Sequence, residues 1–152
     1  MTTPTMPELE AQEASLLLPA FDETIACRLG GILVNLAQIR NLPVVINIRS
    51  ANRTFFHAAL PGSAANNDNW ARRKSNTALL MGRASLIIGM KNAANGRSLA
   101  TDGLPEADYA DHGGAVPLRV KGAGMVAVAT VSGLPQVEDH KLVVAGIEAL
   151  LG

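Results

Sequence analysis

Four residues of one short stretch carry side chains that could bind a ligand. They are Trp70, the only tryptophan, and the three cations that follow it after one alanine, Arg72, Arg73 and Lys74. On a helix, consecutive side chains point in different directions, so the cations would meet a flat polyanion poorly. Two of them could hold one compact anion, because arginine offers a planar fork of donors. Two alternatives remain open: an interface anchored by tryptophan and arginine, or a helix surface on which the cations pair with nearby carboxylates.

A second candidate group is His112, which is followed by Gly113 and Gly114 just before an expected strand. Glycines let backbone amides approach a ligand closely, and a loop histidine can titrate, donate or ligate. We therefore expect all three residues to bind a ligand, and His112 is also the candidate general acid or base. The alternative is a histidine that only bonds a loop carbonyl, with glycines that serve the turn.

The other two histidines are weaker candidates. His140 lies on the apolar stripe of the last expected helix, next to Asp139, and we expect both to support the site structurally rather than contact a ligand. His57 lies in the middle of an expected strand. Imidazole is a common metal ligand, but the chain has no HxH, HExxH or HxxxH spacing, so we expect no metal site.

Other catalytic motifs are missing from the sequence. Ser132 precedes a glycine, but the GxSxG pattern of a nucleophile elbow is absent, and no GxGxxG lies between a strand and a helix. Cys27 is the only cysteine, which excludes an intramolecular disulfide and a thiolate metal cluster. Its position in an apolar helical stretch predicts a buried, inert thiol.

The composition argues against nucleic acid and membranes as partners. Lys and Arg number 13, Asp and Glu also number 13, and aromatic residues make up 3% of the chain. A nucleic-acid-binding domain is normally basic, and single-strand binding uses aromatic platforms. There is no apolar run of membrane-spanning length and no signal-peptide pattern, so we expect a cytoplasmic protein. The apolar content of 48%, mostly aliphatic, suggests that another copy of the chain covers part of the surface.

The periodicity of the 152 residues predicts one domain of the α/β class, more narrowly α+β, at residues 8–152 after a flexible tail at residues 1–7. A helix over 22–40 has an apolar stripe that ends at Ile39. Asp68 is the expected N-cap of one bent helix or two helices over 68–94. Strands are expected at 44–49, 54–60, 116–122 and 125–133, the last two joined by a glycine turn, and Pro135 should start a final helix.

Three stretches together resemble a known family: LPGSAANNDNWARRKSNT, DYADHGGAVPLRVKG and TVSGLPQVEDHKLVV. They are similar to the haem-degrading domain family, also called GlcG-like or HbpS-like, and within it to the uncharacterised UPF branch. The resemblance implies a profilin-like fold, with an antiparallel sheet of about five strands flanked by helices on both faces. It also implies a homo-oligomer, and some relatives bind haem.

From these observations we expect a cytoplasmic homo-oligomer that binds a small anionic or carboxylate ligand between the Trp70 helix and the His112 loop. Haem is a special case, and it would be bound non-covalently because no CxxCH motif occurs. One alternative is an enzyme that acts on a small carbonyl or carboxylate substrate through His112. Another is an interaction or adaptor protein without a small ligand.

Overall fold

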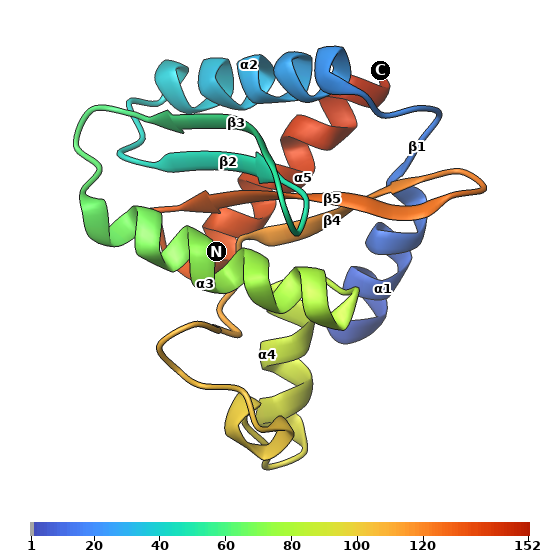
Figure 1. Ribbon diagram of the computed structural model, residues 1–152, viewed down its shortest axis with the longest axis vertical. Helices are drawn as coiled ribbons and strands as arrows, with labels where there is room; N and C mark the ends of the chain where they lie inside the picture. Colours follow the sequence, from blue (N-terminus) through green and yellow to red (C-terminus); the bar gives the residue numbers. More distant parts are fainter. Residues whose placement is uncertain (1) are drawn as a thin grey trace.

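The computed structural model describes residues 2–152, and these form five α-helices, one short 3₁₀ helix and one five-stranded sheet (Figure 1). In chain order the elements are α1 (Met6–Ser15), β1 (Leu17–Leu18), α2 (Glu23–Ile39), β2 (Val45–Arg49), β3 (Thr54–Ala59), α3 (Ala65–Met81), α4 (Ser85–Ala94), η1 (Leu99–Asp102), β4 (Ala115–Val120), β5 (Gly124–Ser132) and α5 (Gln136–Leu151). The predicted α+β class is confirmed. Helix α1 begins inside the predicted tail, and Met1 lies outside the described residues.

The sheet has the strand order β1-β4-β5-β2-β3. All neighbouring pairs are antiparallel except β1 and β4, which run parallel, so the sheet is mixed rather than purely antiparallel. The β4–β5 hairpin turns through Gly122 and Gly124, both in the left-handed region of backbone space, as the glycine turn predicts. Strand β1 has two residues, too few for a periodicity to reveal it.

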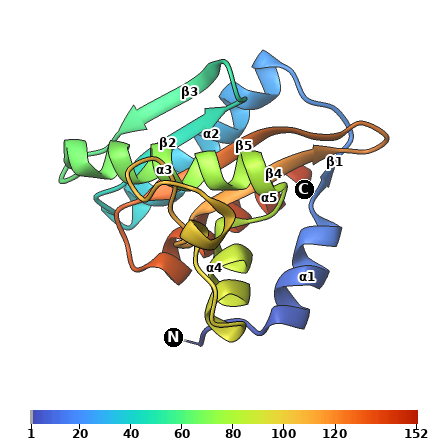
Figure 2. The same cartoon turned by 60° about the horizontal axis from the view of Figure 1, so that its bottom comes forward.

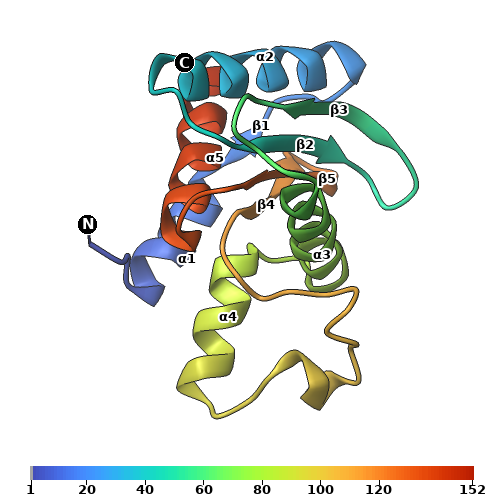
Figure 3. The same cartoon turned by 90° about the vertical axis from the view of Figure 1, so that its left-hand side faces the viewer.

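Helices cover both faces of the sheet. Figure 3 shows α2 and α5 on one side and α3 on the other. The main core lies between the sheet and the α2–α5 pair, with Leu29, Leu33, Ile46, Ile48 and Val143 fully buried. Figure 2 shows α1 beside α4, where a smaller apolar cluster joins them. None of the helices formed by residues 2–152 has the length and apolarity needed to cross a membrane.

The buried face of α2 differs from the predicted stripe. Its buried residues are Ala26, Leu29, Gly30, Leu33 and Ala37. A side chain at Gly30 would collide with Phe56, so small residues let α2 approach the sheet closely. The side of α2 that packs against the sheet is the side that carries the small residues. The other sides face outward, so Ile39 is 71% exposed and Cys27 is exposed as well. The prediction of a buried thiol is wrong.

Helix α3 begins earlier than the sequence predicts. Its N-cap is Ala64, whose backbone N–H donates to Asn67 Oδ1 at 2.8 Å, and Asp68 lies inside the first turn. The N-cap assignment to Asp68 is therefore wrong, because an asparagine one residue earlier satisfies the helix start. Gly82 ends α3 with φ 69°, so 65–94 forms two helices rather than one bent helix.

Candidate functional site

The three consecutive cations of α3 reach three different surroundings. Arg72 pairs with Asp108 at 3.0 Å, and its guanidinium also donates to the carbonyl of Ala107. Arg73 donates to the carbonyl of Glu106 at 2.9 Å, with its guanidinium carbon 4.4 Å from the centre of the Trp70 ring. Both arginines therefore fasten the 106–109 loop to α3. The Lys74 side chain instead reaches the Gly113 carbonyl and Asp139 of α5.

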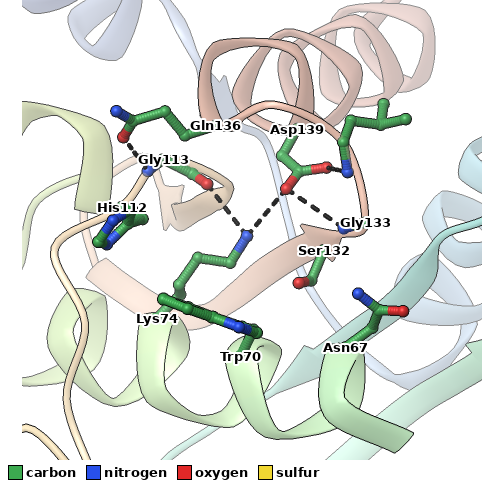
Figure 4. A pocket seen from close by; sticks show the side chains of 10 residues that line it. Asn67, Trp70, Lys74, His112, Gly113, Ser132, Gly133, Gln136 and Asp139 are labelled. Atoms are coloured by element: carbon green, nitrogen blue, oxygen red, sulfur yellow. Dashed lines mark hydrogen bonds and ion pairs between the residues drawn. The ribbon is translucent and has the colours of Figure 1, made fainter. Parts of the chain in front are cut away.

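Lys74 and Asp139 form a buried ion pair, each residue being 2% exposed. The ammonium of Lys74 donates to the carbonyls of Gly113 at 3.0 Å and Val131 at 2.8 Å, and to Asp139 Oδ2 at 3.1 Å (Figure 4). Asp139 Oδ1 also accepts from the backbone N–H of Leu134 at 2.9 Å. An ammonium has three donors, and all three are used.

Burial lowers the pKa of Lys74 and raises the pKa of Asp139, and the charge of each partner opposes the shift of the other. The hydrogen bonds favour the charged pair, because an ammonium satisfies the three acceptors around Nζ at once. Lys74 is consequently not a free base. It links α3, the 112–114 loop and α5 into one frame.

A cavity of about 240 Å³ lies above this pair. Three segments line it: one face of α3, the 112–113 loop and the corner between β5 and α5. Figure 4 shows Trp70 and His112 on one side and Ser132 on the other. Lys74 and Asp139 also line the cavity, so the buried pair contributes to its wall.

Trp70 and His112 contact each other. Their ring centres are 5.0 Å apart and the rings meet edge to face at 69°. The His112 side chain is 55% exposed, and its Nδ1 lies 3.9 Å from Asp111 Oδ1, beyond hydrogen-bond distance. Among residues 2–152, neither ring nitrogen of His112 has a hydrogen-bond partner. A second cavity of about 350 Å³ is lined by the same two rings together with Arg73 and Tyr109.

The two glycines after His112 hold the loop in close contact with α3, β5 and α5. The Gly113 N–H donates to Gln136 Oε1 at 2.9 Å, so this amide already has an acceptor. Gly114 has φ 135°, and a side chain there would collide with Lys74 and with the Val131 carbonyl. A ligand cradled by the Gly113 amide would have to displace Gln136.

His140 and His57 lie outside this cavity. His140 is 2% exposed, its Nε2 lies 2.8 Å from Gln12 Oε1, and burial lowers its pKa from 6.5 to about 4. The ring is therefore neutral near pH 7, with Nε2 donating to Gln12. His57 uses both ring nitrogens, with Asp68 and Asn47. Within residues 2–152 there is no group of three His, Cys, Asp or Glu side chains placed to hold a metal ion.

Sequence reasoning missed five residues that line the first cavity: Asn67, Ser132, Gly133, Leu134 and Gln136. It also missed that Lys74 is buried. One signal was available, because small residues at 71, 75 and 78 mark the buried face of α3, and Lys74 lies on that face.

The family of the chain follows from comparison with known proteins. Residues 21–148 match the family model described as haem degrading protein HbpS-like. The chain belongs to this family. A UPF0303 protein of Streptomyces coelicolor is 46% identical over 99% of this chain and 96% of its own length. A UPF0303 protein of Paraburkholderia xenovorans is 44% identical over 95% of this chain and 88% of its own length. The family and branch predicted from the sequence are confirmed.

Solved structures support the fold. The Ybr137w protein superposes with a TM-score of 0.88 at 31% identity, covering 97% of this chain and 88% of that one. HbpS gives a TM-score of 0.70 at 19% identity, over 91% of this chain and 96% of that one. The PduOC–haem complex gives 0.74 at 20% identity, over 86% and 94%. The last two likenesses concern the fold alone.

Proposed function

We propose that this HbpS-like protein binds a small carboxylate-bearing ligand in the cavity between Trp70, His112 and the β5–α5 corner. The observation that carries the proposal is a set of hydrogen-bond donors without partners among residues 2–152. They are the Ser132 hydroxyl, the Asn67 side-chain N–H groups and an imidazole N–H of His112, and all line one cavity. A carboxylate only accepts hydrogen bonds, so it matches a wall of donors.

The charges of the wall fit a small, weakly held anion. Lys74 and Asp139 cancel each other, and Asp139 is already held by Lys74 and two backbone amides. Arg73 lies against the face of Trp70 and is 4.4 Å from the ring centre, so its positive charge is close to the cavity wall without entering it. Recognition would therefore depend mainly on hydrogen bonds, with Trp70 as an apolar surface for the ligand's carbon atoms.

Haem fits this cavity less well than a small carboxylate. A free imidazole such as His112 can ligate iron, and Arg73 suits a propionate. The cavity, however, has a volume of about 240 Å³, and polar side chains from Asn67, Ser132 and Gln136 make up much of its wall. Pockets for larger ligands are mostly apolar and about 300–1,000 Å³ in volume. This cavity by itself thus does not enclose a porphyrin.

Trp70 is the only tryptophan and stands in the cavity wall, so its fluorescence reports binding directly. We would titrate acetate, succinate and citrate at constant ionic strength into the wild type, Ser132→Ala and the control Ser15→Ala. Ser15 is exposed on α1, and its hydroxyl donates to the backbone carbonyl of Gln12. We expect saturable changes for at least one acid, weakened about two- to tenfold by Ser132→Ala and unchanged by Ser15→Ala.

Two outcomes would overturn the proposal. One is a fluorescence signal that rises linearly for every acid and equally in both serine variants. The other is stoichiometric binding of hemin that is lost in His112→Ala, which would make the tetrapyrrole the ligand instead.

Catalysis is the second candidate function, and the free nitrogens of His112 near Asp111 favour it. A general acid or base must be open to its substrate, and the His112 side chain is 55% exposed. If the protein turns over a small carbonyl or carboxylate compound, His112→Gln should abolish the rate and its pH dependence while Trp70 fluorescence still reports binding. A rate that persists in His112→Gln would exclude this role.

We also propose that the protein assembles with itself. Large apolar side chains remain exposed at Leu17, Ile39, Leu80 and Leu151, and a second chain that covers them would remove this apolar area from water. Native mass spectrometry should show one multimer for the wild type and a smaller species for Ile39→Lys or Leu80→Lys. A wild-type monomer at micromolar concentration would contradict self-assembly.

A further inference from the structure

A third cavity, of about 380 Å³, lies between α3 and the hairpin of β2 and β3. Arg49 at the end of β2 and Arg72 on α3 both line it, together with His57 and Asp68. Trp70, Lys74 and His112 do not. Helix α3 therefore presents Lys74 to one cavity and Arg72 to a different one.

Arg49 is a half-buried cation that has no counter-ion among residues 2–152. Its guanidinium donates to Ser75 Oγ at 2.9 Å, to the Ser50 carbonyl at 3.4 Å and to Asn76 Oδ1, all of which are neutral acceptors. Among residues 2–152 no carboxylate forms an ion pair with it. Burial lowers the pKa of Arg49, and the charge of Arg72 lowers it further. A partly buried charge without a partner is costly, which makes an anion at this place favourable.

Both arginines retain free donors. A guanidinium has five N–H groups, and Arg49 uses three of them. Arg72 uses four, two toward Asn69 and one each toward Asp108 and Ala107. Two N–H groups of Arg49 and one of Arg72 are left for a ligand.

The opposite wall is fixed by a chain of hydrogen bonds. Asn47 Nδ2 donates to His57 Nδ1 at 3.1 Å, and His57 Nε2 donates to Asp68 Oδ1 at 2.8 Å. Both nitrogens of His57 are occupied, so the ring is not a free base. Asp68 is the one carboxylate in the lining and accepts from His57, and Asp108 pairs with Arg72 at 3.0 Å. Among residues 2–152, Arg49 therefore supplies the one positive charge of the lining that forms no ion pair with a carboxylate. That charge matches a monoanion better than a polyanion.

We propose that this cavity is a second binding site, for a small oxyanion held by the guanidinium groups of Arg49 and Arg72. The ligand class is a phosphate or carboxylate group, because both offer acceptor oxygens at the spacing of a guanidinium fork. The site is separate from the Trp70–His112 cavity, so the proposed function and this site can each hold or fail alone.

The test is an NMR titration of isotopically labelled protein with inorganic phosphate and, separately, acetate at fixed ionic strength. We expect saturable shifts of the guanidinium N–H signals of Arg49 and Arg72, whose free donors are Nη–H groups. Arg49→Gln should weaken binding at least tenfold. The control Arg53→Gln, which removes an exposed cation paired with Glu23 at 3.0 Å, should leave it unchanged. Tighter binding of phosphate than of acetate identifies a phosphate site, and the reverse identifies a carboxylate site.

Non-specific screening gives a different result. Shifts that grow linearly with the concentration of added phosphate or acetate, and equally at Arg53 and Arg49, would overturn the proposal. So would saturable binding that survives Arg49→Gln in full. If Arg49→Gln does not fold, Arg72→Gln replaces it, and undiminished binding in that variant likewise rejects the site.

Discussion

The buried imidazole of His140 should make the protein sensitive to mild acid. Burial is the main cause that lowers its pKa from 6.5 to about 4; the charge of Glu13 opposes this shift, and that of Lys141 adds to it. Within residues 2–152 the ring has one hydrogen bond, to Gln12, and its buried Nδ1 has no partner, so a second proton would have no acceptor there. Protonation therefore favours the unfolded chain.

The size and sign of the effect follow from linkage. Each unit of difference between folded and unfolded pKa values corresponds to about 1.4 kcal/mol, so this lowering corresponds to about 3 kcal/mol of stability. Because the folded pKa of His140 is depressed, its contribution is fully present above pH 6.5. It is lost as the pH falls from there toward about 4.

The assay is urea unfolding of the wild type and His140→Gln at a series of pH values from 7.5 to about 4. Glutamine can still bond Gln12 but has no charge to gain. The carboxylates of the protein titrate in both the wild type and the variant. The difference between their two curves of unfolding free energy against pH therefore isolates the contribution of His140. We expect the wild type to lose about 3 kcal/mol more than the variant over this range. Parallel curves would refute the argument from burial.

Three further outcomes follow from the frame around the cavity. Lys74→Met should destabilise the fold by about 3–5 kcal/mol in urea unfolding, because it leaves Asp139 buried and unpaired. Adding Asp139→Asn should recover part of that loss. Losses that are strictly additive in the double variant would contradict the ion pair. Gly114→Ala should lower the free energy of unfolding by about 1–3 kcal/mol more than Gly122→Ala. Both residues have positive φ, but of the two only Gly114 has close neighbours. Equal melting temperatures of the two variants would count against that packing. Cys27 is exposed, so in the native protein it should react with a maleimide as fast as an accessible surface thiol does. A thiol that reacts only after unfolding would show that Cys27 is covered.

Local patterns predicted the elements well. The alternation in Val45–Arg49, the glycine turn before β5 and the break at Gly82 depend on neighbours in the chain, so they can be recognised without the fold. Strand β1 could not be recognised, because its two residues become a strand only through pairing with β4. The exposure of Cys27 likewise depends on which face of α2 the sheet selects.

The site was harder to predict, because its key contacts join distant residues. A charged residue such as Lys74 is normally assumed to be solvated, and its burial depends on Asp139, 65 positions away in the chain. Trp70 and His112 were recognised individually from their residue types, and the structure brings them into contact. The role of Ser132 depends on where the β5–α5 corner lies, which no local pattern encodes.

A crystal structure with the acid that binds best in the fluorescence titration tests most directly whether a small carboxylate lies beside Trp70. We expect electron density for the carboxylate within hydrogen-bond distance of the Ser132 hydroxyl and the Asn67 amide, with carbon atoms against the Trp70 ring. Density for the acid found only in the Arg49 cavity would contradict the proposed function while supporting the second site. A cavity beside Trp70 that holds only water at saturating acid would contradict carboxylate binding at this site.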